Sequence, residues 1–272
     1  MRNMRKTFGL MIGASVAMIM LASCDGKNKK SEDSTLFEFK EYHYKMLAKS
    51  SDMDPDDYMF GDGSRLVEGE IILPLRINDN DITELRDSLI SMTGVIVDED
   101  GEVLPNLDAD EGFKLVSDNP NMAEPSTSES SFTTICLINQ KIIVWQNDYF
   151  SYDGGAHGYG SSVFVNYSIE LNKVLTLNDI FTRGFEDKLN EIVRKNLRAF
   201  HSEELYDTGY STMNDIEYSN VFRLYPNAIE FYYAPYMIGP YSSGIITCTI
   251  GLEELENAGI INREVKKQVF GL

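Results

Sequence analysis

Residues 132–169 read FTTICLINQKIIVWQNDYFSYDGGAHGYGSSVFVNYSI, and this stretch decides the fold class of the second half of the chain. Phe132–Ile138, Lys141–Asn147 and Ser162–Ile169 are runs rich in β-branched and aromatic residues, separated by turn-forming residues. Runs of this length and composition are typical of β-strands. The sequence therefore predicts three successive strands that belong to a mainly antiparallel sheet.

The connection between the last two of these strands, YDGGAHGYG over residues 152–160, holds four glycines in its last seven positions. Such a density of glycine indicates unusual backbone angles or the close approach of another segment. In one interpretation His157 is a buried imidazole that hydrogen-bonds a backbone carbonyl and pins a tight turn. In the other, the connection is a rim where Tyr152, Asp153, His157 and Tyr159 contact a ligand.

A second unusual cluster, FYYAPYMIGPYSSG over residues 231–244, contains four tyrosines beside two prolines and two glycines. Aromatic side chains supply rigid contact area for proteins or carbohydrates. Tyr236 and Tyr241 are therefore candidate ligand-binding residues. The alternative is a structural loop whose tyrosines are half-buried between strands.

Apolar spacing elsewhere predicts two helices and further strands. One helix is expected to begin at Asp81, an N-cap with Glu84 three residues on, and to run to about Met92. Residues 185–200 have the clearest amphipathic pattern of the chain. Residues 105–131 are polar and predict a mobile loop or an insertion. The further strands are expected at residues 36–46, 66–75, 221–224, 228–233 and 244–250.

These elements predict an α+β fold of two small domains, each a mainly antiparallel sheet with one principal helix. The N-terminal domain is expected at residues 36–131, with acidic loops, and the C-terminal domain at residues 132–272. A flexible polar tether is expected at residues 24–35, after a leader at residues 1–23. The first strand of the C-terminal domain is one that the two domains can share.

The N-terminus has the pattern of a bacterial lipoprotein signal. Arg2, Arg5 and Lys6 precede an apolar stretch at residues 8–22, which is too short for an ordinary membrane span. Small residues then precede Cys24, which predicts lipid attachment at its sulfur and cleavage before it. The alternative is an ordinary signal peptide with an incidental cysteine. The lipid reading places the protein in the cell envelope, anchored to the periplasmic or surface side of a bacterial membrane.

The charge of the chain excludes some classes of partner. Lys and Arg number 24 and Asp and Glu number 43, so the formal charge is 24 − 43 = −19. Removal of residues 1–23 takes away three basic residues and gives 21 − 43 = −22. This balance argues against nucleic acid as a ligand, because nucleic-acid binders place Lys and Arg on phosphates. It favours a cationic partner, or serves solubility alone.

No motif of a metal site, cofactor site or catalytic site is complete. The acidic runs that begin at Asp52 and Asn106 lack the glycine and final glutamate of an EF-hand loop. The three histidines do not form a zinc motif. We therefore expect no metal and no cofactor. Cys136 and Cys248 both lie in strand-like runs and are interpreted as packing residues or as a disulfide, with a catalytic thiol as the remaining reading.

Several segments resemble a known family. YDGGAHG at residues 152–158, Asn166–Tyr167 and LTLNDIF at residues 175–181 resemble the signature of the RsiV-like extracytoplasmic domain, long named only as a domain of unknown function. IEFYYAPY at residues 229–236 with YSSG at residues 241–244 is similar to that family's C-terminal strand and loop. The resemblance implies a binding module that acts at the cell wall, since the family domain binds lysozyme in RsiV and accompanies a separate deacetylase domain in PdaC.

The leading hypothesis is thus a non-catalytic, lipid-anchored envelope module that binds a protein, such as a cationic lysozyme-type enzyme, or a cell-wall glycan. One rival is an enzyme acting on peptidoglycan or another polysaccharide through His157 and carboxylates that the fold brings near. The other rival is a structural envelope lipoprotein that has no dedicated ligand.

Overall fold

The computed structural model describes residues 14–22, 34–50, 63–98, 101–105, 113–117, 125–200 and 213–271. Cys24 and the residues of its tether up to 33 lie outside this part. The strands are β1 (Ala14–Ala22), β2 (Ser34–Ser50), β3 (Ser64–Ile77), β4 (Val95–Val97), β5 (Val103–Pro105), β6 (Phe113–Ser117), β7 (Thr127–Ile138), β8 (Ile142–Tyr152), β9 (Tyr159–Ser168), β10 (Lys173–Val174), β11 (Phe222–Tyr225), β12 (Ala228–Tyr233) and β13 (Ile246–Gly251). The helices are α1 (Thr83–Thr93), α2 (Leu177–Ile180), α3 (Glu186–Phe200), α4 (Leu252–Asn257) and α5 (Arg263–Val265), with a 3-10 turn η5 (Tyr241–Ser243) and a π-helical turn η6 (Lys266–Phe270).

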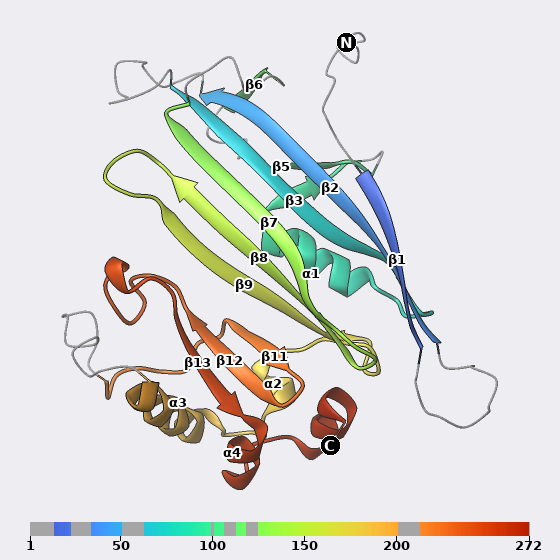
Figure 1. The fold of residues 1–272 in the computed structure, drawn as a ribbon, viewed down its shortest axis with the longest axis vertical. Helices are drawn as coiled ribbons and strands as arrows, with labels where there is room; N and C mark the ends of the chain where they lie inside the picture. Colours follow the sequence, from blue (N-terminus) through green and yellow to red (C-terminus); the bar gives the residue numbers. More distant parts are fainter. Residues whose placement is uncertain are drawn as a thin grey trace.

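One long sheet organises the α+β fold. Its strand order is β1-β2-β3-β7-β8-β9-β10, and β6 pairs with the end of β2. Every pair in this sheet is antiparallel except β3 with β7, which is parallel. A second sheet of order β11-β12-β13 lies with α3 beside the β9 side of the long sheet (Figure 1). The α+β class expected from the sequence is therefore confirmed.

Strand β8 is buried on both faces because successive side chains of a strand point to opposite sides. Ile143 and Trp145 pack in one core, which lies under α1 and includes residues of β2 and β3. Ile142 and Val144 pack in a second core with α3 and the three-stranded sheet. All four side chains are fully buried. The continuous apolar run IIVW therefore supplies both cores at once.

The first core depends on a close contact at Gly69. This residue of β3 lies directly opposite Tyr44 of β2 and Ser131 of β7. A Cβ atom at Gly69 would overlap both the Tyr44 hydroxyl and the Ser131 carbonyl. The Tyr44 ring crosses the space above the glycine, and its burial raises the pKa of the phenol to about 12. Gly69 is thus a packing requirement rather than a turn.

The second core is joined to the long sheet by the side chain of Asn166. Its amide nitrogen donates to the Phe222 carbonyl at 2.9 Å, and its amide oxygen accepts the Leu224 N–H at 2.9 Å. The Asn166 carbonyl accepts the Leu175 N–H at 2.7 Å. One asparagine therefore satisfies backbone groups of β11 and of the segment after β10, where no strand ladder is available.

Most expected elements are confirmed, and some bounds are corrected. The helix expected from Asp81 has Ile82 as its N-cap, while the Asp81 carboxylate accepts the Thr83 N–H from one position further out. Part of the segment expected to be a loop at residues 105–131 is strand, because β6 pairs with β2 and β7 begins at Thr127. The helices after β13 carried too short an apolar pattern to be predicted.

The two-domain division stays a prediction, and its boundary at 131/132 falls inside β7. Strand β1 comes from the apolar segment that we expect to be removed, and it pairs with β2. Removal of the leader would withdraw this partner from the β2 edge. Within the described ranges, no helix is long and apolar enough to cross a membrane. Cys136 and Cys248 are free thiols, the first exposed at a bulge of β7 and the second buried in the second core.

Gly69→Ala tests the packing requirement in the first core. We expect the free energy of unfolding in urea to fall by about 1–3 kcal/mol, because the added methyl must displace the Tyr44 ring or the strand backbone. Gly251→Ala is the matched control, since a Cβ there meets nothing within 4 Å and the backbone φ is −67°. Equal stabilities of the two variants would contradict the proposed contact.

Candidate functional site

The end of the β8–β9 hairpin has a fixed shape. Gly154 and Gly155 have φ angles of 86° and 101°, which favour glycine strongly. The Tyr152 hydroxyl donates to the Gly155 carbonyl at 3.0 Å. A Cβ at Gly158 would overlap the Phe150 ring and lie 2.6 Å from the Ser151 carbonyl oxygen. The glycines thus serve both purposes expected of them, unusual angles and close approach.

The two clusters identified in the sequence meet at this hairpin end. The His157 ring stacks on the Tyr241 ring, with centroids 3.9 Å apart and an interplanar angle of 17°. The Nε2 atom of His157 lies 3.2 Å from the Tyr236 hydroxyl oxygen. The Tyr236 and Tyr241 rings are 5.6 Å apart. These three residues, here called the aromatic cluster, come from the β8–β9 connection and from the loop between β12 and β13, which approach each other in Figure 1.

Tyr236 occupies a backbone conformation that tyrosine seldom adopts. Its φ is 72°, in the left-handed region, which costs a non-glycine residue about 1–2 kcal/mol. Its side chain is 41% exposed, so burial returns little of this cost. Met237 and Ile245 of the same loop are also exposed, at 50% and 42%. A strained, exposed aromatic residue beside exposed apolar side chains is typical of a contact surface.

The two ring nitrogens of His157 face a backbone carbonyl and a phenol. The Nδ1 atom of His157 lies 3.0 Å from the Gly158 carbonyl oxygen, and its other nitrogen faces the Tyr236 phenol. Among the described residues, no carboxylate is found against this ring to orient it as a base. His157 bonds a backbone carbonyl, as one sequence interpretation required, but it is exposed rather than buried. Exposed ring faces suit stacking on a sugar or packing on a protein.

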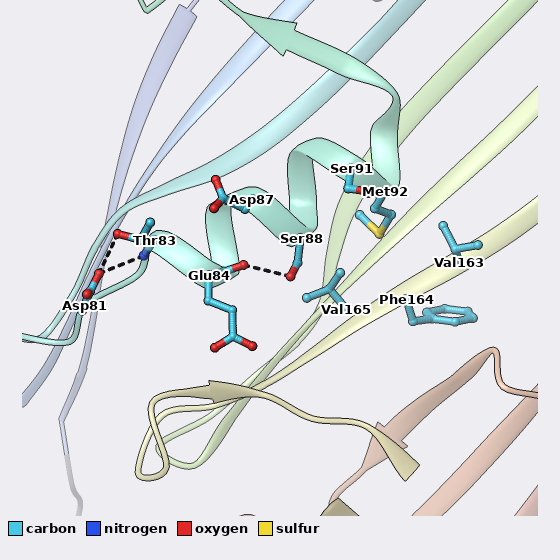
Figure 2. A pocket seen from close by; sticks show the side chains of 10 residues that line it. All are labelled: Asp81, Thr83, Glu84, Asp87, Ser88, Ser91, Met92, Val163, Phe164 and Val165. Atoms are coloured by element: carbon cyan, nitrogen blue, oxygen red, sulfur yellow. Dashed lines mark hydrogen bonds between the residues drawn. The ribbon is translucent and has the colours of Figure 1, made fainter. Parts of the chain in front are cut away.

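A groove of about 1010 Å³ lies between α1 and β9. One wall carries the carboxylates of Glu84 and Asp87 from α1 and of Asp81 just before it, and the other wall is formed by residues 163–165 of β9 (Figure 2). The Thr83 N–H and hydroxyl donate to the Asp81 carboxylate at 3.0 and 2.7 Å, which lowers the pKa of that carboxyl. No basic side chain lines the groove in the part of the chain that the structure describes. No local sequence pattern predicts this groove, because α1 and β9 are distant in sequence.

A third group, Glu41, His43 and Glu70, lies on β2 and β3. Its ligand atoms all lie within 4.8 Å of one another, so the three could hold a metal ion. The His43 ring nitrogens face Glu70 at 3.2 Å and Glu41 at 3.5 Å. Desolvation, followed by the contact with Glu41, raises the pKa of Glu70. These contacts also describe an ordinary ion pair between neighbouring strands, and no sequence motif marks the group.

The structure brings three of the six candidate residues together and leaves the other three apart. His157, Tyr236 and Tyr241 gather in the aromatic cluster. Tyr152 and Asp153 make internal contacts, the first to the Gly155 carbonyl and the second to Arg65, 3.6 Å away. Tyr159 is 38% exposed at the start of β9. Burial raises the pKa of the Cys248 thiol to about 12, which leaves it unsuited to nucleophilic chemistry.

Part of this chain matches a known family model. Residues 178–253 match the model of DUF3298, a protein family of unknown function. This match covers α3, the three-stranded sheet and the loop that bears Tyr236 and Tyr241.

Two solved structures of DUF3298 proteins share the fold. The protein from Bacteroides fragilis is 20% identical, with a TM-score of 0.60 over 87% of this chain and 98% of that chain. The protein from Pseudomonas aeruginosa is 17% identical, with a TM-score of 0.54 over 92% of this chain and 96% of that chain. The comparison with curated proteins finds no match. At these identities the likeness concerns the fold alone.

Tyr236→Gly separates a contact role of this residue from a packing role. Glycine relieves the left-handed backbone, so we expect the free energy of unfolding in urea to stay within about 1 kcal/mol of the wild type or to rise. Tyr236→Val is the comparison, because a β-branched residue at this φ should lower it by about 1–2 kcal/mol. A loss of several kcal/mol in the glycine variant would mean that the ring is needed for folding.

Proposed function

We propose that this protein is a non-catalytic binding module of the cell envelope, lipid-anchored through Cys24, that holds a protein or a cell-wall glycan. The single observation that carries the proposal is the aromatic cluster. His157, Tyr236 and Tyr241 come from two loops, their rings meet at the surface, and Tyr236 keeps a strained backbone there. A purely structural loop would gain more from burying these rings than from exposing them.

Two further features support this proposal. The cluster is formed by the segments that resemble the RsiV-like extracytoplasmic domain, YDGGAHG and the tyrosine-rich loop, and that resemblance implies a role at the cell wall. The net charge of −19, or −22 after loss of the leader, and the carboxylates of the α1–β9 groove favour a cationic protein such as a lysozyme-type enzyme. His157 meets a carbonyl and a phenol, so no observed contact favours a catalytic function.

The double variant Tyr236→Ala/Tyr241→Ala tests the binding role. The Cys24→Ser form of the chain is passed, at low salt, over immobilised hen lysozyme and over insoluble peptidoglycan, and its retention is measured. We expect retention on one of these supports, and a loss of about tenfold or more in the double variant, because buried aromatic anchors dominate interface energies. Tyr225→Ala is the control, a half-buried tyrosine on β11 outside the cluster.

If a chain that still unfolds cooperatively is retained on neither support, lysozyme and peptidoglycan are both excluded as ligands. Retention that survives in the double variant would move the site away from the aromatic cluster. Weakening by 0.5 M salt on the lysozyme support alone would show that charge carries that interaction.

Cys24→Ser tests the anchor. We expect the unaltered protein, expressed in a bacterial host, to incorporate labelled palmitate and to enter the detergent phase, because two or more acyl chains give stable attachment. The variant should incorporate no label and should partition into water. Incorporation of label into the variant, or partition of the wild-type protein into the aqueous phase, would contradict the lipid anchor.

A further inference from the structure

Among the residues that the structure describes, the outer edge of β9 has a strand partner only at its end. Lys173 and Val174 of β10 pair with Ser168 and Tyr167, at the last two residues of β9. The Leu175 N–H then donates to the Asn166 carbonyl, which shows that the backbone groups of Asn166 point to this outer edge. Residues two positions apart in a strand share this direction, so the N–H and C=O of Phe164 also point outward. Within the described ranges, no backbone group pairs with them.

The groove lies beside this open edge. Phe164 lines it together with its neighbours Val163 and Val165. Helix α1 runs along β9 in Figure 2, and the Asn80 amide donates to the Tyr167 hydroxyl at 2.9 Å, which fixes the start of the helix near the β10 end. The groove of about 1010 Å³ therefore opens between the polar side chains of α1 and residues 163–165 of β9.

Charge indicates what kind of segment would fit. Glu84 and Asp87 are exposed, and neither has an ion-pair partner among the described residues. Together with Asp81 they give one wall three carboxylates with no basic neighbour in the lining. Glu84 and Asp87 are about one turn apart in α1, which spaces them by about 5 Å along the helix. Every second residue of a strand is spaced by about 7 Å. Lysine and arginine side chains are long and flexible, so alternate basic residues of a strand on β9 would match this acidic wall in charge.

From these observations we infer that the β9 edge beside α1 binds an extended basic segment of a partner protein as an added strand. The backbone of the segment pairs with the outward N–H and C=O of Phe164, and its basic side chains face Glu84 and Asp87. This inference rests on the proposed binding function and names the class of ligand, a basic peptide rather than a glycan. Main-chain pairing gives such complexes their affinity, and the side chains on one face give them specificity.

The test uses the Cys24→Ser form of the full chain and three capped heptapeptides. The first alternates lysine and valine, the second replaces its lysines with glutamate, and the third is the first peptide with every backbone amide methylated. We expect measurable binding of the first peptide alone at low salt. On binding, hydrogen exchange of the Phe164 amide should slow by at least tenfold, while amides of the β13 edge should keep their rates.

Two charge variants complete the test. Glu84→Gln/Asp87→Asn should weaken binding of the lysine peptide about fivefold, a loss typical of two exposed charges. Glu186→Gln/Asp187→Asn is the matched control, because it removes two exposed acids from the first turn of α3 and changes the net charge equally. It should bind the lysine peptide as the wild type does.

Equal binding of the methylated peptide, an unchanged Phe164 exchange rate or equal losses in the two charge variants would overturn the inference. Failure of the lysine peptide to bind, while the aromatic cluster still retains lysozyme or peptidoglycan, would overturn this inference and leave the proposed function standing. If the peptide binds and the Tyr236→Ala/Tyr241→Ala variant is still fully retained on lysozyme or peptidoglycan, the aromatic cluster is not the binding site and the inference about the groove stands.

Discussion

The burial of β8 on both faces is the constraint on which the rest of the structure depends. Because Ile142 and Val144 enter one core while Ile143 and Trp145 enter the other, each face of this strand must be covered separately. The strands and helix of the first half cover one face, and α3 with the three-stranded sheet covers the other. In β8 no residue beyond Asn147 belongs to either core. The end of the β8–β9 hairpin therefore extends past both cores, and its side chains are available for contact.

The Asn166 side chain fixes the position of the second sheet relative to the long sheet, and so places the loop of the aromatic cluster near the hairpin end. A strand ladder cannot join β9 to β11 across the change of sheet, so a side-chain amide makes two of the missing hydrogen bonds. The amide is buried, and loss of either partner would leave a polar group unpaired. This fixed junction holds β12 and its following loop near the hairpin end, where Tyr236 and Tyr241 reach His157.

Local pattern was enough to predict most strands, α3 and both unusual clusters. It could not give the parallel pairing of β3 with β7, because the polar run at Thr127–Ser131 has no buried face to mark it as a strand until Ser131. It also named six contact candidates without ranking them. The internal bonds of Tyr152 and Asp153, and the meeting of His157 with Tyr236 from 79 positions away, depend on tertiary contacts that no local pattern encodes.

In the proposed binding function, the acidity and the aromatic cluster would act at different distances. A large negative charge speeds the approach of a cationic partner, but at physiological salt its field fades within about 8 Å of the surface. Net charge alone therefore cannot choose where the partner docks. Only charges that line a contact keep their effect, and Glu84 and Asp87 line the groove between α1 and β9. His157 lies two residues before β9 begins, and the groove borders the middle of that strand at residues 163–165, so the basic segment proposed for the groove would extend toward the aromatic cluster.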